Sequence, residues 1–81
     1  MQMTAERLRC LQVVAKVGAG SSVSHDAPEL APFCDDASTL TKPDVFNQCH
    51  DAGWLHSGHD DRTGTSYVSL TDAGRQALAN L

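Results

Sequence analysis

Two neighbouring amide side chains, Asn47 and Gln48, have the chemistry to recognise a nucleic-acid base. Asparagine and glutamine can each donate to and accept from the major-groove edge of adenine. The same two residues stand between Asp44 and Asp51, however, and the alternative that they are ordinary solvated surface residues stays open.

Two cations, Lys42 and Arg62, are the nearest candidates for phosphate contacts around these amides. Lysine and arginine bind nucleic acid by replacing the counterions around phosphate. Arg62 has an alternative partner in Asp60 or Asp61, and such an exposed ion pair would contribute little to stability. A contact to phosphate or to the minor groove and a local pair with aspartate are therefore both open for Arg62.

A second group of side chains has the types that bind zinc. Cys49, His50, His56 and His59 lie within eleven residues. Structural zinc sites usually combine two pairs of ligands, each pair spaced two to four residues apart, and only His56 and His59 form such a pair. We predict no metal site and expect both histidines to be exposed, where protonation near about pH 6 would add positive charge.

The sequence offers no catalytic group of residues. The aspartate pairs at residues 35–36 and 60–61 fall in loops, where adjacent carboxylates point apart. The glycines at positions 18 and 20 follow no strand that would make a phosphate-binding loop. We predict that the chain is not an enzyme and uses no cofactor.

Length and composition suit one globular domain. The chain has 81 residues, 41% of them hydrophobic and 20% charged, which is ordinary usage for a folded protein. No apolar run reaches the roughly 18 residues of a membrane span, and the N-terminus lacks the pattern of a signal peptide. Cys10, Cys34 and Cys49 include no close pair, which favours reduced, buried thiols. We expect a cytoplasmic protein without a membrane segment.

The net charge of −4 is concentrated in the middle of the chain. Residues 21–40 carry four carboxylates and no Lys or Arg, and residues 41–60 carry three carboxylates and one lysine. Residues 1–20 sum to +2, and residues 61–81 are balanced. Because nucleic-acid binders usually present a basic face, this distribution argues against DNA binding by the middle segment.

Hydrophobic spacing and capping residues predict two helices in the first half. Thr4 is a good cap for the first helix, and the glycines at positions 18 and 20 end it. Residues 21–27 form a loop or a short extended piece. Pro28 then opens a short helix that runs to about Cys34, with Leu30 and Phe33 pointing inward.

A third helix is predicted to start at Thr41, with Pro43 in its first turn and Gly53 at its end. Its positions divide into two faces. The apolar face carries Val45, Cys49 and Ala52, and the opposite face carries Asp44, Asn47, Gln48 and Asp51.

A hairpin and a last helix complete the chain. Residues 54–56 and 65–70 are predicted strands, joined by a polar tip at residues 57–64. Trp54 is expected to close the core between the hairpin and the third helix. Thr71 and Asp72 begin the last helix, whose apolar positions are Ala73, Ala77, Leu78 and Leu81. The fold class is therefore α+β, with three helices, a two-stranded hairpin and a C-terminal helix.

Three stretches in the second half carry a family resemblance. They are residues 51–55 (DAGWL), residues 59–62 (HDDR) followed by 67–69 (YVS), and residues 70–78 (LTDAGRQAL), the last being the most specific. Together they resemble the winged helix-turn-helix core of MarR-type regulators over residues 40–78, about half of the chain.

The resemblance implies one winged-helix domain over residues 1–81, with a helix-turn-helix at about 28–53 and a wing at about 54–70. It also implies that the third helix enters the major groove of double-stranded DNA and that the wing touches the minor groove. The residues that would face DNA are Thr41, Lys42, Asn47 and Gln48, with Arg62 as the wing-tip contact. The sequence contains no counterpart of the long helices that pair MarR-type subunits, so monomer and homodimer both stay open.

Two functions of different classes follow from these features. The first is a small DNA-binding transcriptional regulator of the winged-helix type. The second is an acidic winged-helix module that binds protein, such as a phage or mobile-element protein that docks on a host protein and inhibits it. The net charge and the missing dimer helices favour the second function, and the fold alone does not decide between them.

Overall fold

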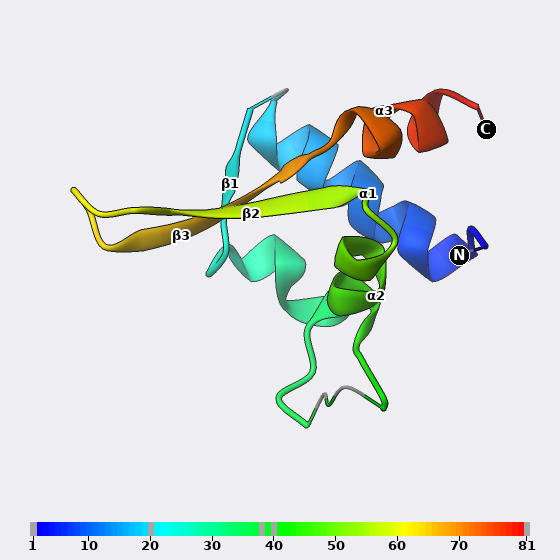
Figure 1. The fold of residues 1–81 in the computed structure, drawn as a ribbon, viewed down its shortest axis with the longest axis horizontal. Coiled ribbons are helices and arrows are strands. Elements are labelled where there is room, and N and C mark those ends of the chain that lie inside the picture. The colour runs from blue at the N-terminus through cyan, green and yellow to red at the C-terminus, as the bar shows by residue number, and fades with distance from the viewer. Residues whose placement is uncertain (1, 20, 38, 40, 81) are drawn as a thin grey trace.

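Helices and strands are interspersed along the chain in a computed structural model that describes residues 2–19, 21–37, 39 and 41–80. Figure 1 shows their arrangement. The elements are α1 (Ala5–Gly18), β1 (Val23–Ser24), the 3₁₀ helix η1 (Pro28–Phe33), α2 (Val45–Asp51), β2 (Leu55–Asp60), β3 (Thr65–Leu70) and α3 (Asp72–Ala79). The α+β class predicted from the sequence is confirmed.

The three strands form one antiparallel sheet in the order β1-β3-β2. β2 and β3 pair from Leu55 opposite Leu70 to Asp60 opposite Thr65. The predicted polar tip at residues 57–64 was therefore too long, because its first half pairs with β3 and only residues 61–64 turn. The sheet also has a third strand, since Val23 of β1 lies opposite Val68 of β3.

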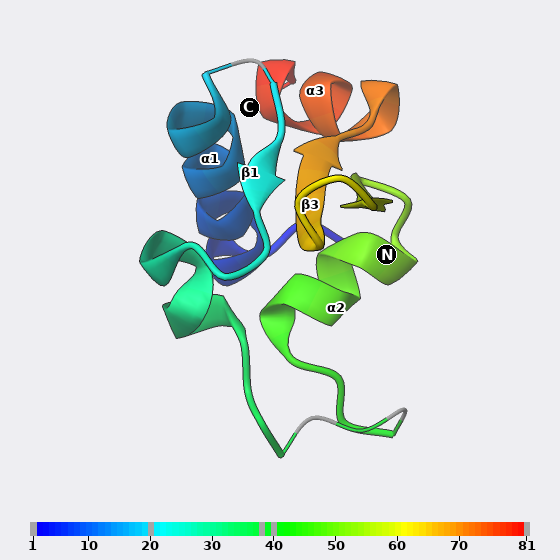
Figure 2. The same ribbon diagram turned by 90° about the vertical axis from the view of Figure 1, so that its left-hand side faces the viewer.

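The core is one cluster of apolar side chains to which every element except α3 contributes a buried residue. Its members are Cys10, Leu11, Val14, Val23, Leu30, Phe33, Phe46, Cys49, Leu55 and Val68, none more than 7% exposed. Leu30 and Phe33 point inward as predicted. Trp54 is partly buried and packs against this cluster, as do Ala77 and Leu78 of α3. Figure 2 shows α1 and η1 on one side of the body, with α2 and β3 beside them and α3 above.

Local hydrogen bonds set the beginnings of α1 and α3 where the sequence predicts them. The Thr4 hydroxyl accepts from the Arg7 backbone N–H at 3.2 Å, and the Thr71 hydroxyl accepts from the Gly74 N–H at 3.0 Å. At the other end of α1 the left-handed residue is Ala19 (φ 49°). The predicted stop at position 20 lies outside the described residues.

The predicted start of the third helix at Thr41 is wrong. Asp44 is the cap of α2, and its Oδ1 accepts from the Asn47 N–H at 2.7 Å. An ionised carboxylate suits the positive end of a helix better than a hydroxyl. The Thr41 hydroxyl instead pairs with the Thr39 hydroxyl at 3.0 Å, before Pro43.

Two predicted burials are also wrong. Cys34 is exposed, because it follows η1 in extended backbone instead of continuing a helix. Ala73 is exposed, and its neighbour Gly74 is the buried residue of α3. A Cβ atom at Gly74 would lie 2.2 Å from the Trp54 carbonyl oxygen, so α3 approaches the start of the hairpin at glycine. The predicted apolar position Leu81 lies outside the described residues.

Candidate nucleic-acid interface

The outward surface of α2 is small and carries Asn47 and Asp51, both exposed, with His50 half-buried. The Asn47 backbone N–H serves the helix cap, and its side chain lies in solvent. α2 thus presents one amide and one carboxylate close together. An amide can recognise adenine, and a carboxylate beside it repels phosphate.

Gln48 does not share that outward surface, contrary to the predicted face. Its side chain is half-buried, and both ends of the amide are engaged inside the molecule. Nε2 donates to the Pro43 carbonyl at 2.9 Å, and Oε1 accepts from Arg7 Nε at 3.0 Å. The helix is only two turns long and packs on α1, so this position turns toward Arg7 instead of solvent.

Thr41 and Lys42 are exposed in a tight turn before α2. The Lys42 backbone N–H donates to the Thr39 hydroxyl at 3.1 Å, and the Thr39 N–H donates to the Lys42 carbonyl at 3.2 Å. These bonds close the turn and hold it in shape. The segment between η1 and α2 reaches past α2 on the side away from α3 (Figures 1 and 2).

Arg62 is exposed in the turn between β2 and β3, at the far end of the hairpin. Its backbone N–H donates to Asp60 Oδ1 at 2.9 Å, and the Gly64 N–H donates to the Asp60 carbonyl at 2.8 Å. Among the ion pairs of the described residues none involves the Arg62 guanidinium, so the local partner considered for it is not used. The turn lies away from α2 in Figure 1, and the structure leaves the Arg62 turn and the α2 residues as two separate areas.

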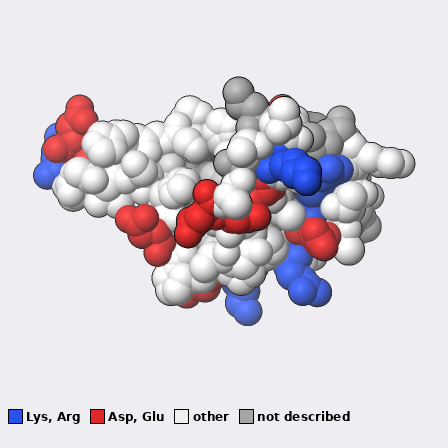
Figure 3. Space-filling view, turned by 90° about the horizontal axis from the view of Figure 1, so that it is seen from below, with Lys and Arg blue, Asp and Glu red and all other residues white. Residues whose placement is uncertain are grey.

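Several carboxylates accept hydrogen bonds or form ion pairs within the fold. Asp44 caps α2 and also accepts from the Asp35 N–H at 2.8 Å, while Asp35 accepts from the Ala37 N–H at 2.9 Å. Asp72 pairs with Arg75 at 3.0 Å. Their charges remain, however. Figure 3 shows Lys and Arg side chains in separate groups with Asp and Glu between them, without a continuous basic face in that view.

The sheet brings together three polar residues that sequence analysis did not group. The His25 N–H donates to the Ser66 carbonyl at 2.9 Å, and His59 Nδ1 lies 3.3 Å from Ser66 Oγ. The His25 ring meets the ring of Phe46 in α2 edge-on, with centroids 5.1 Å apart. The sequence does not reveal this grouping, because β1 is only two residues long and the polar residues 57–64 predict a loop around His59.

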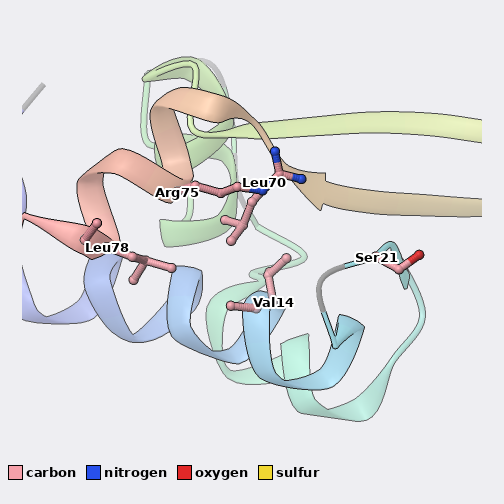
Figure 4. A pocket seen from close by; sticks show the side chains of 7 residues that line it. Val14, Ser21, Leu70, Arg75 and Leu78 are labelled. Carbon is pink, nitrogen blue, oxygen red and sulfur yellow. The ribbon is translucent and has the colours of Figure 1, made fainter.

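On another side of the molecule a shallow groove of about 400 Å³ lies between α1, α3 and the end of β3. Figure 4 shows Val14, Leu70 and Leu78 around it, with Arg75 and Ser21 at its edges. The lining offers no carboxylate, imidazole or thiol among the described residues. The groove therefore offers the Ser21 hydroxyl but no acid–base group among its described lining residues that could activate it.

The Cys10 and Cys34 thiols are poorly suited to nucleophilic chemistry, whereas the hydrogen bond with Cys10 lowers the pKa of the buried Cys49 thiol. Contact with the Cys49 thiol and burial raise the pKa of Cys10. Burial, followed by the carboxylates of Asp44 and Asp36, raises the pKa of Cys34. Because the thiolate is the reactive form, raised pKa values keep the Cys10 and Cys34 sulfurs inert near neutral pH.

The described residues contain neither a metal-binding cluster nor a helix that could span a membrane. No three His, Cys, Asp or Glu side chains in that part of the chain are grouped so that they could hold a metal ion. None of its helices combines the length and the apolar character needed to cross a bilayer.

Comparisons of the chain with protein-family models, with curated proteins and with solved structures found no match.

Proposed function

We propose that the chain is a winged-helix domain that binds double-stranded DNA and regulates transcription. The observation that carries the proposal is the topology. α2 runs directly into the β2–β3 hairpin, and β1 pairs on the other edge of β3. In this arrangement η1 and α2 serve as the helix-turn-helix, with residues 34–44 as a longer connection than the usual turn of three or four residues, and the hairpin serves as the wing.

Each exposed candidate residue has a distinct role in this proposal. Asn47 contacts a base edge in the major groove, where a side-chain amide pairs with adenine. Thr41 and Lys42 contact the backbone from the turn before α2, and Arg62 contacts DNA from the wing tip. Gln48, which the family resemblance also placed on DNA, instead holds α2 against Arg7.

The charge distribution sets how strong such binding can be. Lys42 and Arg62 supply two cations, while Asp51 is exposed on the same helix surface as Asn47. The salt dependence of binding scales at about 0.9 per phosphate contacted in duplex DNA. We expect a slope of about −2 in a plot of log affinity against log salt, which is shallow for a DNA-binding protein.

Fluorescence anisotropy with a labelled random duplex at about 50 mM and 200 mM salt tests the proposal. The expected result is binding at the lower salt that weakens at the higher salt. The double variant Lys42→Ala and Arg62→Ala should bind more weakly. The matched control Arg9→Ala and Lys16→Ala removes the same charge from α1 and should bind nearly as the natural chain does. Absence of binding at the lower salt would overturn the proposal.

The acidic surface favours a second candidate, a module that binds protein. The observation is that Asp and Glu side chains separate the cations in Figure 3, within a chain of net charge −4. Such a domain would dock on a host protein and inhibit it, as a phage or mobile-element product does. A chain that fails to bind DNA at low salt and captures one stoichiometric protein from a lysate would support this candidate.

Both candidates would act in the cytoplasm, either as a monomer or as a homodimer. Light scattering of the purified chain distinguishes these two states, and its mass should be compared with the 8.6 kDa of one chain.

A further inference from the structure

Three exposed polar side chains form a row across β2, β3 and the turn that follows β1. His59 lies opposite Ser66 in the β2–β3 register, and the row ends on the other side at His25, which follows β1. Hydrogen bonds join neighbours in the row, from the His25 N–H to the Ser66 carbonyl and between His59 Nδ1 and Ser66 Oγ. The row is therefore a defined part of the sheet and not a chance grouping of loop residues.

The row lies on the same face of the sheet as the core. Side chains alternate between the two faces along a strand. His25, Ser66 and His59 are each an even number of residues from the buried side chains Val23, Val68 and Leu55. The row thus continues the core-facing side of the sheet outward to positions where its side chains are exposed, and its end at His25 touches Phe46 of α2.

This position joins the two areas that the proposed function requires. The Arg62 turn lies beyond the row at the tip of the hairpin, and α2 lies at its inner end. A duplex that contacted both α2 and the wing would pass along the face of the sheet between them. The groups there are two imidazoles and a hydroxyl, which donate hydrogen bonds to phosphate oxygens.

We infer that His25, Ser66 and His59 contact the phosphodiester backbone of DNA and make its binding stronger in mildly acidic solution. The inference rests on the proposed function and extends it to a surface that neither the sequence nor the family resemblance assigned. Imidazole is the side chain that ordinarily gains a proton between about pH 8 and pH 5. A protonated imidazole adds positive charge, which is scarce at this interface.

Carboxylates surround the row and set its charge balance. Asp61 Oδ1 lies 3.7 Å from His59 Nε2. Asp60 follows His59 at the end of β2, and Asp26 follows His25. On the side of α2, Phe46 is the residue that contacts His25, and the carboxylate nearest to Phe46 in the sequence is Asp44. The Asp44 oxygens accept from the Asn47 and Asp35 N–H groups. The His59 and Asp61 side chains are 53% and 99% exposed, so their pairing is weak and leaves the imidazole available to phosphate.

The test compares DNA binding by the natural chain and by the double variant His25→Gln and His59→Gln. Anisotropy with the random duplex is measured at pH 6 and pH 8 over a series of salt concentrations. At pH 6 the double variant should bind on the order of tenfold more weakly. At pH 6 the two contacts of the row add to those of Lys42 and Arg62, so the salt slope should be about −4 for the natural chain and about −2 for the double variant. At pH 8 the two proteins should differ much less.

His56→Gln is the matched control, because His56 is exposed on the same strand but on its opposite face. It removes a titratable group from the hairpin without touching the row, so its affinity and pH dependence should equal those of the natural chain. Because His25 packs on Phe46, thermal unfolding of each variant is measured as well. If the double variant is unstable, His59→Gln alone should remove about half of the change in salt slope.

Two different failures can be told apart. If the natural chain does not bind DNA at either pH, the proposed function and this inference both fall. If the natural chain binds DNA but the double variant keeps its affinity and pH dependence, or the His56 control loses as much, only the inference about the row is overturned.

Discussion

The side chain of Gln48 links the two helices that frame the core. Its Oε1 accepts from Arg7 Nε at 3.0 Å, and its Nε2 donates to the Pro43 carbonyl at 2.9 Å. The Arg7 carbonyl meanwhile accepts from the Cys49 thiol at 3.7 Å. Arg7 of α1 is thus hydrogen-bonded to two consecutive residues of α2, Gln48 and Cys49, which lie 41 and 42 positions later in the chain. These two bonds set where α2 lies on α1.

Replacing Gln48 with alanine should therefore destabilise the fold. The variant leaves Arg7 Nε and the Pro43 carbonyl without their partner, and loss of a part-buried hydrogen bond costs about 1 kcal/mol each. We expect the free energy of unfolding in urea to fall by about 1–2 kcal/mol. Asn47→Ala, one position away and exposed, is the control and should change it by less than about 0.5 kcal/mol. Equal effects of the two substitutions would contradict this role for Gln48.

Asp44 is predicted to be the residue on which the start of α2 depends. Asp44→Ala removes the acceptor for both the Asn47 N–H at the start of α2 and the Asp35 N–H. It should lower the free energy of unfolding by about 1–2 kcal/mol. Asp44→Asn keeps a good cap and should recover much of the loss. Thr41→Ala, at the position first expected to cap the helix, should be nearly neutral. A larger loss of stability from Thr41→Ala than from Asp44→Ala would show that Thr41, and not Asp44, caps the helix.

Gly74→Ala should be strongly destabilising. The added Cβ would lie 2.2 Å from the Trp54 carbonyl oxygen, and backbone cannot move aside as a flexible side chain can. We expect a loss of at least about 2 kcal/mol, since overpacking typically costs 1–3 kcal/mol. In the exposed part of the same helix, Gln76→Ala serves as the control and should leave the melting temperature almost unchanged. A tolerated Gly74→Ala would mean that α3 does not approach the hairpin so closely.

Asp51→Asn should strengthen DNA binding under the proposed function. The carboxylate is exposed on α2 beside Asn47, so its removal lowers repulsion of phosphate. A gain of a few-fold in affinity at about 50 mM salt is expected, and it should shrink at about 200 mM salt. Asp72→Asn removes the same charge from α3 and should have little effect. An equal gain from both variants would show that only the total charge matters.

Stability should fall in alkaline solution because of Cys10. Contact with the Cys49 thiol and burial raise the pKa of Cys10 above the usual value of about 9, so the unfolded chain releases this proton first. The contribution is complete below about pH 9, and above it the free energy of unfolding declines by up to about 1.4 kcal/mol per pH unit. Urea unfolding with a reductant at pH 8, 9 and 10 measures this decline. Cys10→Ala should show a flatter profile, and an unchanged slope in that variant would refute the assignment.

Local chemistry was enough to predict most of the elements. Thr4 and Thr71 cap their helices as expected because a hydroxyl and the N–H three residues later are brought together by the first helical turn itself. Leu30 and Phe33 face inward because Pro28 and a spacing of three residues already define the side of the short helix. The exposed positions of Thr41, Lys42, Asn47 and Arg62 also follow from their neighbours in sequence.

The tertiary structure decided what depends on partners far along the chain. The second oxygen of the cap Asp44 accepts from the Asp35 N–H, nine residues earlier in the chain, and the face of Gln48 depended on Arg7. The row from His25 to His59 required the register of three strands, which alternation within one strand does not reveal. The sequence by itself thus determined the order of helices and strands and which side chains are polar. Packing between distant segments determined which of those polar side chains are used inside the molecule and which remain for a partner.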